Sequence, residues 1–142
     1  MDGELSWQEK RREASAAHAA ALEQRKAAET AQARALLADF VQELKTRGVA
    51  PEPLRATVAG SGTSYRTNIT GWYLRRNRSL GVDPDGNFYI LATPTSVKSR
   101  LAGVRLVPSD PPLTVGLGAR DGESMPLRQL LAMRLEDSDN PT

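Results

Sequence analysis

The sequence predicts an α+β fold: a long N-terminal helix, then a small antiparallel β-meander of four to five strands, then a C-terminal helix. Two observations predict it. Residues 6–47 contain no glycine or proline and consist mainly of alanine, glutamate, glutamine, arginine, lysine and leucine, which all favour helices. After Pro51, short runs of valine, isoleucine, threonine and aromatic residues alternate with glycine and proline, as expected for strands and turns.

The change of composition between Gly48 and Pro51 also predicts the domain organisation. We expect residues 1–49 to form a charged, alanine-rich helix for self-association or partner docking, residues 54–136 a small β-rich domain, and residues 137–142 a polar tail. A domain of about 80 residues buries only a modest core. The helix, or a second copy of the chain, is therefore expected to help cover it.

Both ends of the long helix carry sequence signals. Ser6 followed by Glu9 matches a capping box, in which a hydroxyl and a carboxylate satisfy the first backbone N–H groups. At the other end, Lys45 and Arg47 suit the negative end of the helix dipole. Gly48 is expected to take a left-handed conformation that stops the helix.

The two halves of this helix differ in their apolar pattern. In the second half, large apolar residues recur on one face and predict docking on a core: Leu36, Leu37, Phe40, Val41 and Leu44. In the first half, the best seven-residue stripe is a candidate surface for helix docking: Trp7, Ala14, Ala21 and Ala28. Because alanine buries little area, the alternative is a solvated helix.

The remainder of the chain predicts short strands and a final helix. Strands are expected at residues 54–59, 67–76, 79–82, 87–93, 103–107 and 113–117, and residues 95–102 suit either a helical turn or a loop. Asp83-Pro84-Asp85-Gly86 predicts a tight hairpin, because proline sets the first turn dihedral and glycine accepts the left-handed one. Ser124 is expected to cap the last helix, with Pro126 in its first turn.

Composition argues against most kinds of chemistry. The chain has no cysteine, which excludes disulfides, thiolate metal sites and cysteine nucleophiles, and His18 is its only histidine. No apolar run approaches the roughly 20 residues that span a bilayer, and no signal-peptide core follows the acidic N-terminus. We therefore expect a cytoplasmic protein that is not an enzyme, uses no cofactor or metal and does not enter a membrane.

Positive charge is concentrated in the middle of the chain. The net charge is only +2, but residues 54–106 contain eight basic and two acidic side chains, whereas residues 107–142 contain three basic and six acidic ones. An anionic partner should therefore bind the middle segment.

One group in that segment combines aromatic rings with guanidinium groups. The candidate residues for binding an anion or a nucleic acid are Tyr65, Arg66, Tyr73, Arg75, Arg76 and Arg78. Rings stack on bases while arginines hold phosphates, as on the sheets of several single-strand-binding modules. The alternative is structural: Trp72 and Leu74 form core, Tyr73 is amphipathic, and the arginines form a solvated turn.

Three weaker motifs are better explained by turns and loops. Residues 60–64 lack the ending of a phosphate-binding loop, and residues 83–87 place glycine wrongly for a calcium loop. Residues 116–122, with Arg120, precede a helix and are a minor candidate anion site.

The sequence therefore favours a non-enzymatic binding or adaptor protein. Its β-rich domain is expected to recognise a protein or an anionic partner, and its N-terminal helix to dimerise the chain or dock on another protein. The alternative is a nucleic-acid-binding accessory factor, and a third, less favoured reading is an enzyme completed by a second subunit or a substrate-supplied metal.

Overall fold

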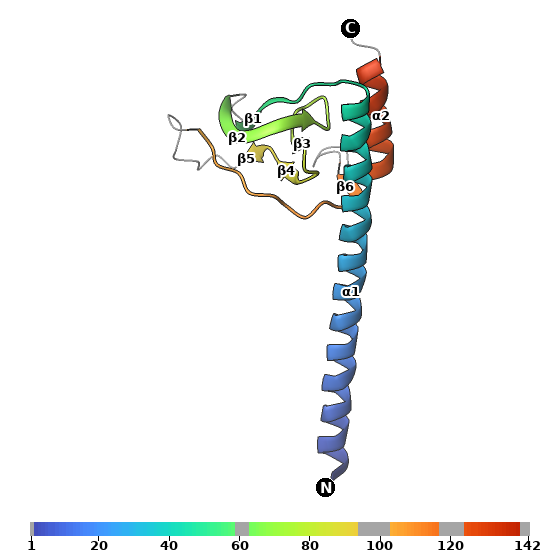
Figure 1. Ribbon diagram of the computed structural model, residues 1–142. Coiled ribbons are helices and arrows are strands. Elements are labelled where there is room, and N and C mark those ends of the chain that lie inside the picture. The colour runs from blue at the N-terminus through green and yellow to red at the C-terminus, as the bar shows by residue number, and fades with distance from the viewer. Residues whose placement is uncertain (1, 59–62, 94–102, 117–123, 140–142) are drawn as a thin grey trace.

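The computed structural model describes residues 2–58, 63–93, 103–116 and 124–139, which form two helices and seven strands. The elements are α1 (Asp2–Thr46), β1 (Glu52–Val58), β2 (Ser64–Tyr73), β3 (Leu80–Val82), β4 (Phe88–Ile90), β5 (Ala92–Thr93), β6 (Thr114–Gly116), β7 (Ser124–Pro126) and α2 (Leu127–Asp139). Figure 1 shows α1 as a rod, with the strands and α2 gathered around its C-terminal half. The predicted α+β class is confirmed.

The helix α1 is unbroken over 45 residues, so it is about 67 Å long at 1.5 Å per residue. It begins at Asp2, and the prediction that Ser6 caps its N-terminus is wrong. The first turn of α1 precedes Ser6, so this residue lies inside the helix rather than at its cap.

The C-terminal end of α1 confirms the predicted glycine stop. Gly48 has a φ of 75°, and its N–H donates to the carbonyl of Lys45 at 3.1 Å. The N–H of Val49 reaches back to the carbonyl of Leu44 at 3.0 Å, which completes a Schellman motif. The chain therefore leaves the helix in a fixed direction toward β1.

The main sheet has the strand order β4-β3-β2-β1-β5. Strands β1 to β4 form the predicted antiparallel meander, and β5 pairs with β1 in parallel. The prediction of one strand over residues 87–93 is wrong, because the chain changes partners at Leu91. The N–H of Leu91 donates to Ser79, and its carbonyl accepts from Thr57 on the far side of the sheet. The two outermost strands are thus consecutive in the chain, and the sheet curls back toward itself.

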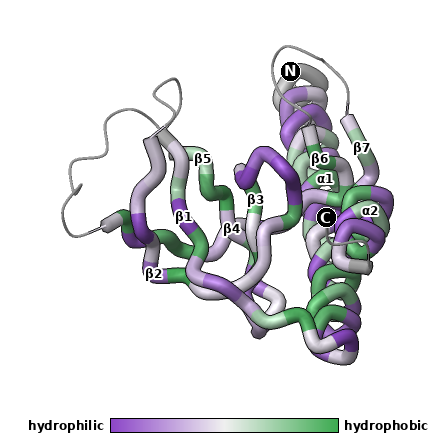
Figure 2. The backbone as a smooth tube through the Cα atoms, turned by 90° about the horizontal axis from the view of Figure 1, so that it is seen from above, coloured by the Kyte–Doolittle hydropathy of each residue, from purple (hydrophilic) through white to green (hydrophobic). Residues whose placement is uncertain are grey.

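The curled sheet separates two apolar clusters. The inner cluster contains Leu54, Ile69, Tyr89 and Leu91, with Tyr73 and Leu106 packed against it. The outer cluster joins the sheet to both helices and contains Leu37, Phe40, Val41, Leu44, Trp72, Leu74, Val82, Phe88, Leu127, Leu130 and Leu131 among its buried members. Figure 2 shows the helices and the β6–β7 hairpin together on one side of the curled sheet.

The predicted core residues of the long helix are confirmed. Leu37, Phe40, Val41 and Leu44 are buried, and Leu36 is partly buried against them. The alternative that Trp72 and Leu74 belong to the core is also confirmed. The hairpin after Asp83 forms as predicted, with Gly86 at a φ of 86°.

Residues 103–126 differ from the prediction in two places. The expected strand at 103–107 is reduced to one bridge between Val104 and Thr67. Ser124 does not cap a helix, because it and Pro126 lie in β7 and pair with β6. The helix α2 begins at Leu127, whose N–H donates to the carbonyl of Leu113 at 2.7 Å, and it continues to Asp139, so the expected tail begins within it.

Candidate functional site

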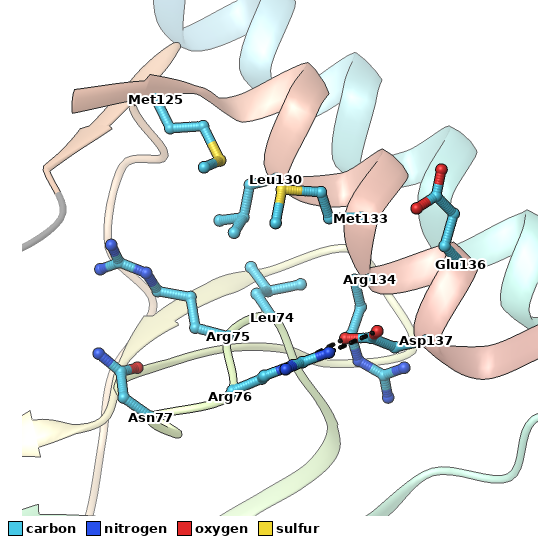
Figure 3. A pocket seen from close by; sticks show the side chains of 10 residues that line it. All are labelled: Leu74, Arg75, Arg76, Asn77, Met125, Leu130, Met133, Arg134, Glu136 and Asp137. Carbon is cyan, nitrogen blue, oxygen red and sulfur yellow. Dashed lines mark hydrogen bonds and ion pairs between the residues drawn. The ribbon is translucent and has the colours of Figure 1, made fainter. Parts of the chain in front are cut away.

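A cleft of about 550 Å³ lies between the turn that follows β2 and the exposed side of α2 (Figure 3). Side chains from two distant parts of the sequence line it: Leu74, Arg75, Arg76, Asn77, Met125, Leu130, Met133, Arg134, Glu136 and Asp137. Two of the six residues predicted to bind an anion, Arg75 and Arg76, are among them.

The turn at one wall of the cleft is held by its own hydrogen bonds. The N–H of Arg78 donates to the carbonyl of Arg75 at 3.0 Å, and Arg78 takes a left-handed conformation with a φ of 59°. The side-chain oxygen of Asn77 accepts from the N–H and the hydroxyl of Ser79 at 3.0 and 2.7 Å. These contacts fix the main chain from which Arg75 and Asn77 project.

Two arginines at the cleft already have partners. Arg134 donates from Nε to the carbonyl of Tyr73 at 2.7 Å and from Nη1 to Ser138 at 2.6 Å, so it fastens α2 to β2. Arg76 pairs with Asp137 at 3.1 Å. The hydrogen bond between them raises the pKa of Arg76 and lowers the pKa of Asp137. Because this pair is exposed, it contributes little to stability.

Arg75 is the uncommitted cation of the cleft. Its side chain is half-buried, and no carboxylate among the side chains that the structure describes pairs with it. Figure 3 places Arg75 on the side of the cleft near Met125, whereas Glu136 lies at the opposite end, near Met133. The cleft therefore has an unpaired cation at the end near Met125, whereas the charged side chains at the other end include both signs: Arg76, Arg134, Glu136 and Asp137.

The floor between these ends is apolar. Leu74 and Leu130 are buried, Met125 is partly buried, and Met133 is 46% exposed. Methionine side chains are flexible and polarisable, so they adapt to apolar ligands of irregular shape. The arrangement suits a ligand with apolar groups and one negative charge.

The other predicted anion-binding residues are separated by the curl of the sheet. Tyr73 packs on the inner cluster, and its hydroxyl accepts from the N–H of Arg55 at 2.9 Å. The guanidinium carbon of Arg78 lies 5.3 Å from the centre of the Tyr73 ring, within cation–π range. Tyr65 alternates with Arg66 along β2, so the two point to opposite faces. The structure thus brings together Arg75 with Arg76 and Tyr73 with Arg78, and places Arg66 elsewhere.

The predicted helix-docking residues lie on the projecting half of α1. Every residue from Ser6 to Glu29 is exposed, including Trp7, Ala14, Ala21 and Ala28. Trp7 is 58% exposed, and the guanidinium carbon of Arg11 lies 4.4 Å from the centre of its ring. Docking through this surface stays a prediction.

Sequence reasoning missed the apolar half of the cleft. Met125, Leu130 and Met133 follow Arg75 by 50 or more residues, and only the fold brings them together. The one available signal was Leu130, which recurs with Leu127, Leu131 and Leu135 at the spacing of an apolar helix face. The candidate motifs at 60–64 and 116–122, including Arg120, lie mostly outside the described residues, as does the segment 95–102.

One tyrosine has a strongly shifted pKa. Burial, with help from a hydrogen bond to Asp83 at 2.9 Å, raises the pKa of Tyr89 to about 12. The same carboxylate also accepts from the side chain and the N–H of Asn87 and from the N–H of Asp85. Tyr89 therefore stays protonated near neutral pH and serves to hold the β3–β4 hairpin.

The described residues provide neither a metal-binding cluster nor a membrane-spanning helix. They include no group of three or more histidine, cysteine, aspartate or glutamate side chains placed to hold a metal ion. Neither helix in this part of the chain combines the length and the apolar composition of a membrane span. Comparison of the chain with protein-family models, curated proteins and solved structures gives no match.

Proposed function

We propose that this protein is a non-enzymatic binding or adaptor protein, and that its cleft beside α2 holds a segment of a partner protein. The observation that supports this proposal is the position of Arg75: a half-buried guanidinium without a carboxylate partner among the described side chains, next to an apolar floor. A segment that carries a carboxylate beside large apolar side chains complements both features. Arginine binds carboxylates with paired hydrogen bonds, which fixes the orientation of the ligand.

The charges of the cleft favour a protein segment over a nucleic acid at this site. Apart from Arg75, the charged side chains of the lining balance, since Arg76 and Arg134 lie with Glu136 and Asp137, so a chain of phosphates would find only one uncompensated cation. A peptide needs only one carboxylate at the Arg75 end, and its apolar groups would cover Leu130 and Met133.

We assign the projecting part of α1 to docking on a helix of another protein or of a second chain. Exposure of all residues from Ser6 to Glu29 supports this role, because none of them contributes to the core of the body. An adaptor of this kind binds one partner at the cleft and another along the rod.

Binding of labelled peptides of about ten residues tests the cleft. One peptide is rich in leucine and glutamate, the second in leucine and lysine, and the third in serine and glutamate. Fluorescence anisotropy should show binding of the first peptide only. Arg75→Gln should weaken this binding about tenfold, since a hydrogen bond to a charged group is lost.

Arg128→Gln is the matched control, because Arg128 is exposed on α2 and lines the groove toward α1 rather than the cleft. It removes the same charge and should leave peptide affinity unchanged. Equal binding of the leucine–lysine peptide, or equal loss in both variants, would show that the cleft does not select a carboxylate.

The alternative function, a nucleic-acid-binding accessory factor, is supported by the excess of basic residues between 54 and 106. The salt dependence of the binding affinity distinguishes the two functions. A phosphate-dominated complex weakens steeply as salt rises, whereas an apolar peptide or helix contact changes little.

A further inference from the structure

Three arginines on neighbouring extended segments share one face of the curled sheet. Arg55 on β1 and Arg66 on β2 are direct cross-strand partners, so their side chains lie on the same face. Arg105 follows Val104, which pairs with Thr67 and donates its N–H to the carbonyl of Arg66 at 2.7 Å. Because side chains alternate along extended chain, Arg105 points to the face of Arg66 rather than that of Thr67.

This arginine face (Arg55, Arg66 and Arg105) is exposed and lies far from the cleft. All three residues are exposed, whereas Leu54, Ala56 and Val104, which alternate with them, are buried. Arg66 precedes Trp72 by six residues on β2, which places it about 20 Å along the strand from the region covered by the helices.

No carboxylate within the described part of the chain neutralises the arginine face. The ion pairs found there involve Arg34, Arg47 and Arg76. Between residues 54 and 106 the only acidic residues are Asp83 and Asp85, which belong to the β3–β4 hairpin. Like charges directly opposite each other destabilise a sheet, so an anion bound here would relieve a repulsion that the fold leaves uncompensated.

Backbone and side-chain contacts hold the three arginines in place. Arg55 donates from Nε to the hydroxyl of Ser64 at 2.9 Å and from Nη2 to its carbonyl at 3.1 Å, which orients the guanidinium and leaves its remaining N–H groups for a ligand. The segment with Arg105 is clamped to β2, because the side chain of Asn68 donates to the carbonyl of Leu106 at 3.2 Å and accepts its N–H at 2.7 Å.

Gly103 allows this segment to approach β2 closely. Its φ is +87°, and a Cβ at this position would stand 3.0 Å from the carbonyl oxygen of Arg66. Any other residue would be strained where the segment that carries Arg105 meets the strand that carries Arg66, so this position favours glycine.

We propose that the arginine face binds the phosphate backbone of a nucleic acid without regard to its base sequence. Guanidinium groups match phosphate oxygens with paired hydrogen bonds. Base stacking is not expected here, because Tyr65 and Tyr73 lie on the other face of β2 and Trp72 is buried. The sequence predicted nucleic-acid binding by a mixed group of arginines and tyrosines, and we assign that binding to the arginine face instead. This proposal does not depend on peptide binding at the cleft.

The test measures binding of the full chain to a mixed-sequence DNA duplex of about 20 base pairs by fluorescence anisotropy. Salt is varied between 50 and 200 mM, because the slope of log K against log salt is about −0.9 for each phosphate contacted. Arg66→Gln and Arg105→Gln should each make the slope shallower by about 0.9, and the double variant by about 1.8. Both substitutions remove one of several like charges from the arginine face, so they should not destabilise the fold.

Arg12→Gln and Arg25→Gln are the matched controls, because they remove the same charge from the exposed rod. They should leave the slope unchanged. Gly103→Ala tests the geometry without any change of charge: it should weaken duplex binding while circular dichroism shows the same secondary structure.

Three results would overturn the proposal. Equal changes in the rod variants would mean that binding follows net charge. A slope that responds to Arg75→Gln and Arg78→Gln instead would place the site at the turn after β2. Binding of polyphosphate but not of the duplex would exclude a nucleic acid as the ligand.

Discussion

The indole N–H of Trp72 donates to the carbonyl of Val49 at 3.1 Å, which ties β2 to the residue where the chain leaves α1. Trp72 is buried in the outer cluster, so the same side chain packs the sheet against the helices and holds the connection between them. The direction of the rod relative to the sheet therefore depends on this one residue as well as on the glycine stop at Gly48.

Trp72→Phe should lower the free energy of unfolding by about 1 kcal/mol from the lost hydrogen bond, and further through the smaller ring. Urea unfolding followed by circular dichroism measures the change. Trp7→Phe is the control, because Trp7 is exposed and should be replaceable without effect. Equal stability of the two variants would mean that the Val49 contact contributes nothing.

Phe40→Ala should lower the free energy of unfolding by about 3–5 kcal/mol, because it opens a cavity between α1, α2 and the sheet. Asp39→Ala, one position earlier on the exposed side of the same helix, should stay within about 0.5 kcal/mol of the wild type. Thermal unfolding measures both. An unchanged melting temperature for Phe40→Ala would show that this face of the helix is not core.

A chain that lacks residues 2–29 should unfold at nearly the temperature of the full chain, because all residues from Ser6 to Glu29 are exposed. The buried part of α1 begins at Ala33 and is retained. Differential scanning calorimetry measures the transition, and light scattering measures whether the oligomeric state changes. Loss of the transition would show that the rod stabilises the body.

High pH should destabilise the protein through Tyr89. The pKa of this phenol is raised from 10 to about 12 in the folded chain, so the unfolded chain loses the proton first. The resulting stabilisation is fully present below pH 10 and is lost as pH rises toward 12. Urea midpoints measured between these values should fall less steeply for Tyr89→Phe than for the wild type; parallel curves would contradict the shift.

Local signals in the sequence predicted the elements whose contacts are near in the chain. Helical periodicity alone was enough to predict the buried stripe from Leu37 to Leu44, and the residue types of the turn were enough to predict the conformation at Gly86. The start of α1 was misplaced because a capping pattern at Ser6 is permitted but not required inside a helix.

Elements that depend on distant partners were not predictable in this way. Leu91 ends one strand and begins another because Ser79 and Thr57 bind its two backbone groups. Ser124 lies in a strand because β6 pairs with it, although its residue type favours a helix cap. For the same reason, the cleft between Arg75 and Met133 and the alignment of Arg55 with Arg66 and Arg105 could not be read from spacing.

The curl of the sheet also limits how a partner can engage the body. Its outermost strands, β4 and β5, are three and two residues long, and Ser109 already bridges β4 at Phe88. Edge strands this short offer little template for an added strand from a partner or from a second copy of the chain. A partner of this part of the protein is therefore expected to bind through side-chain contacts rather than by adding a strand to the sheet.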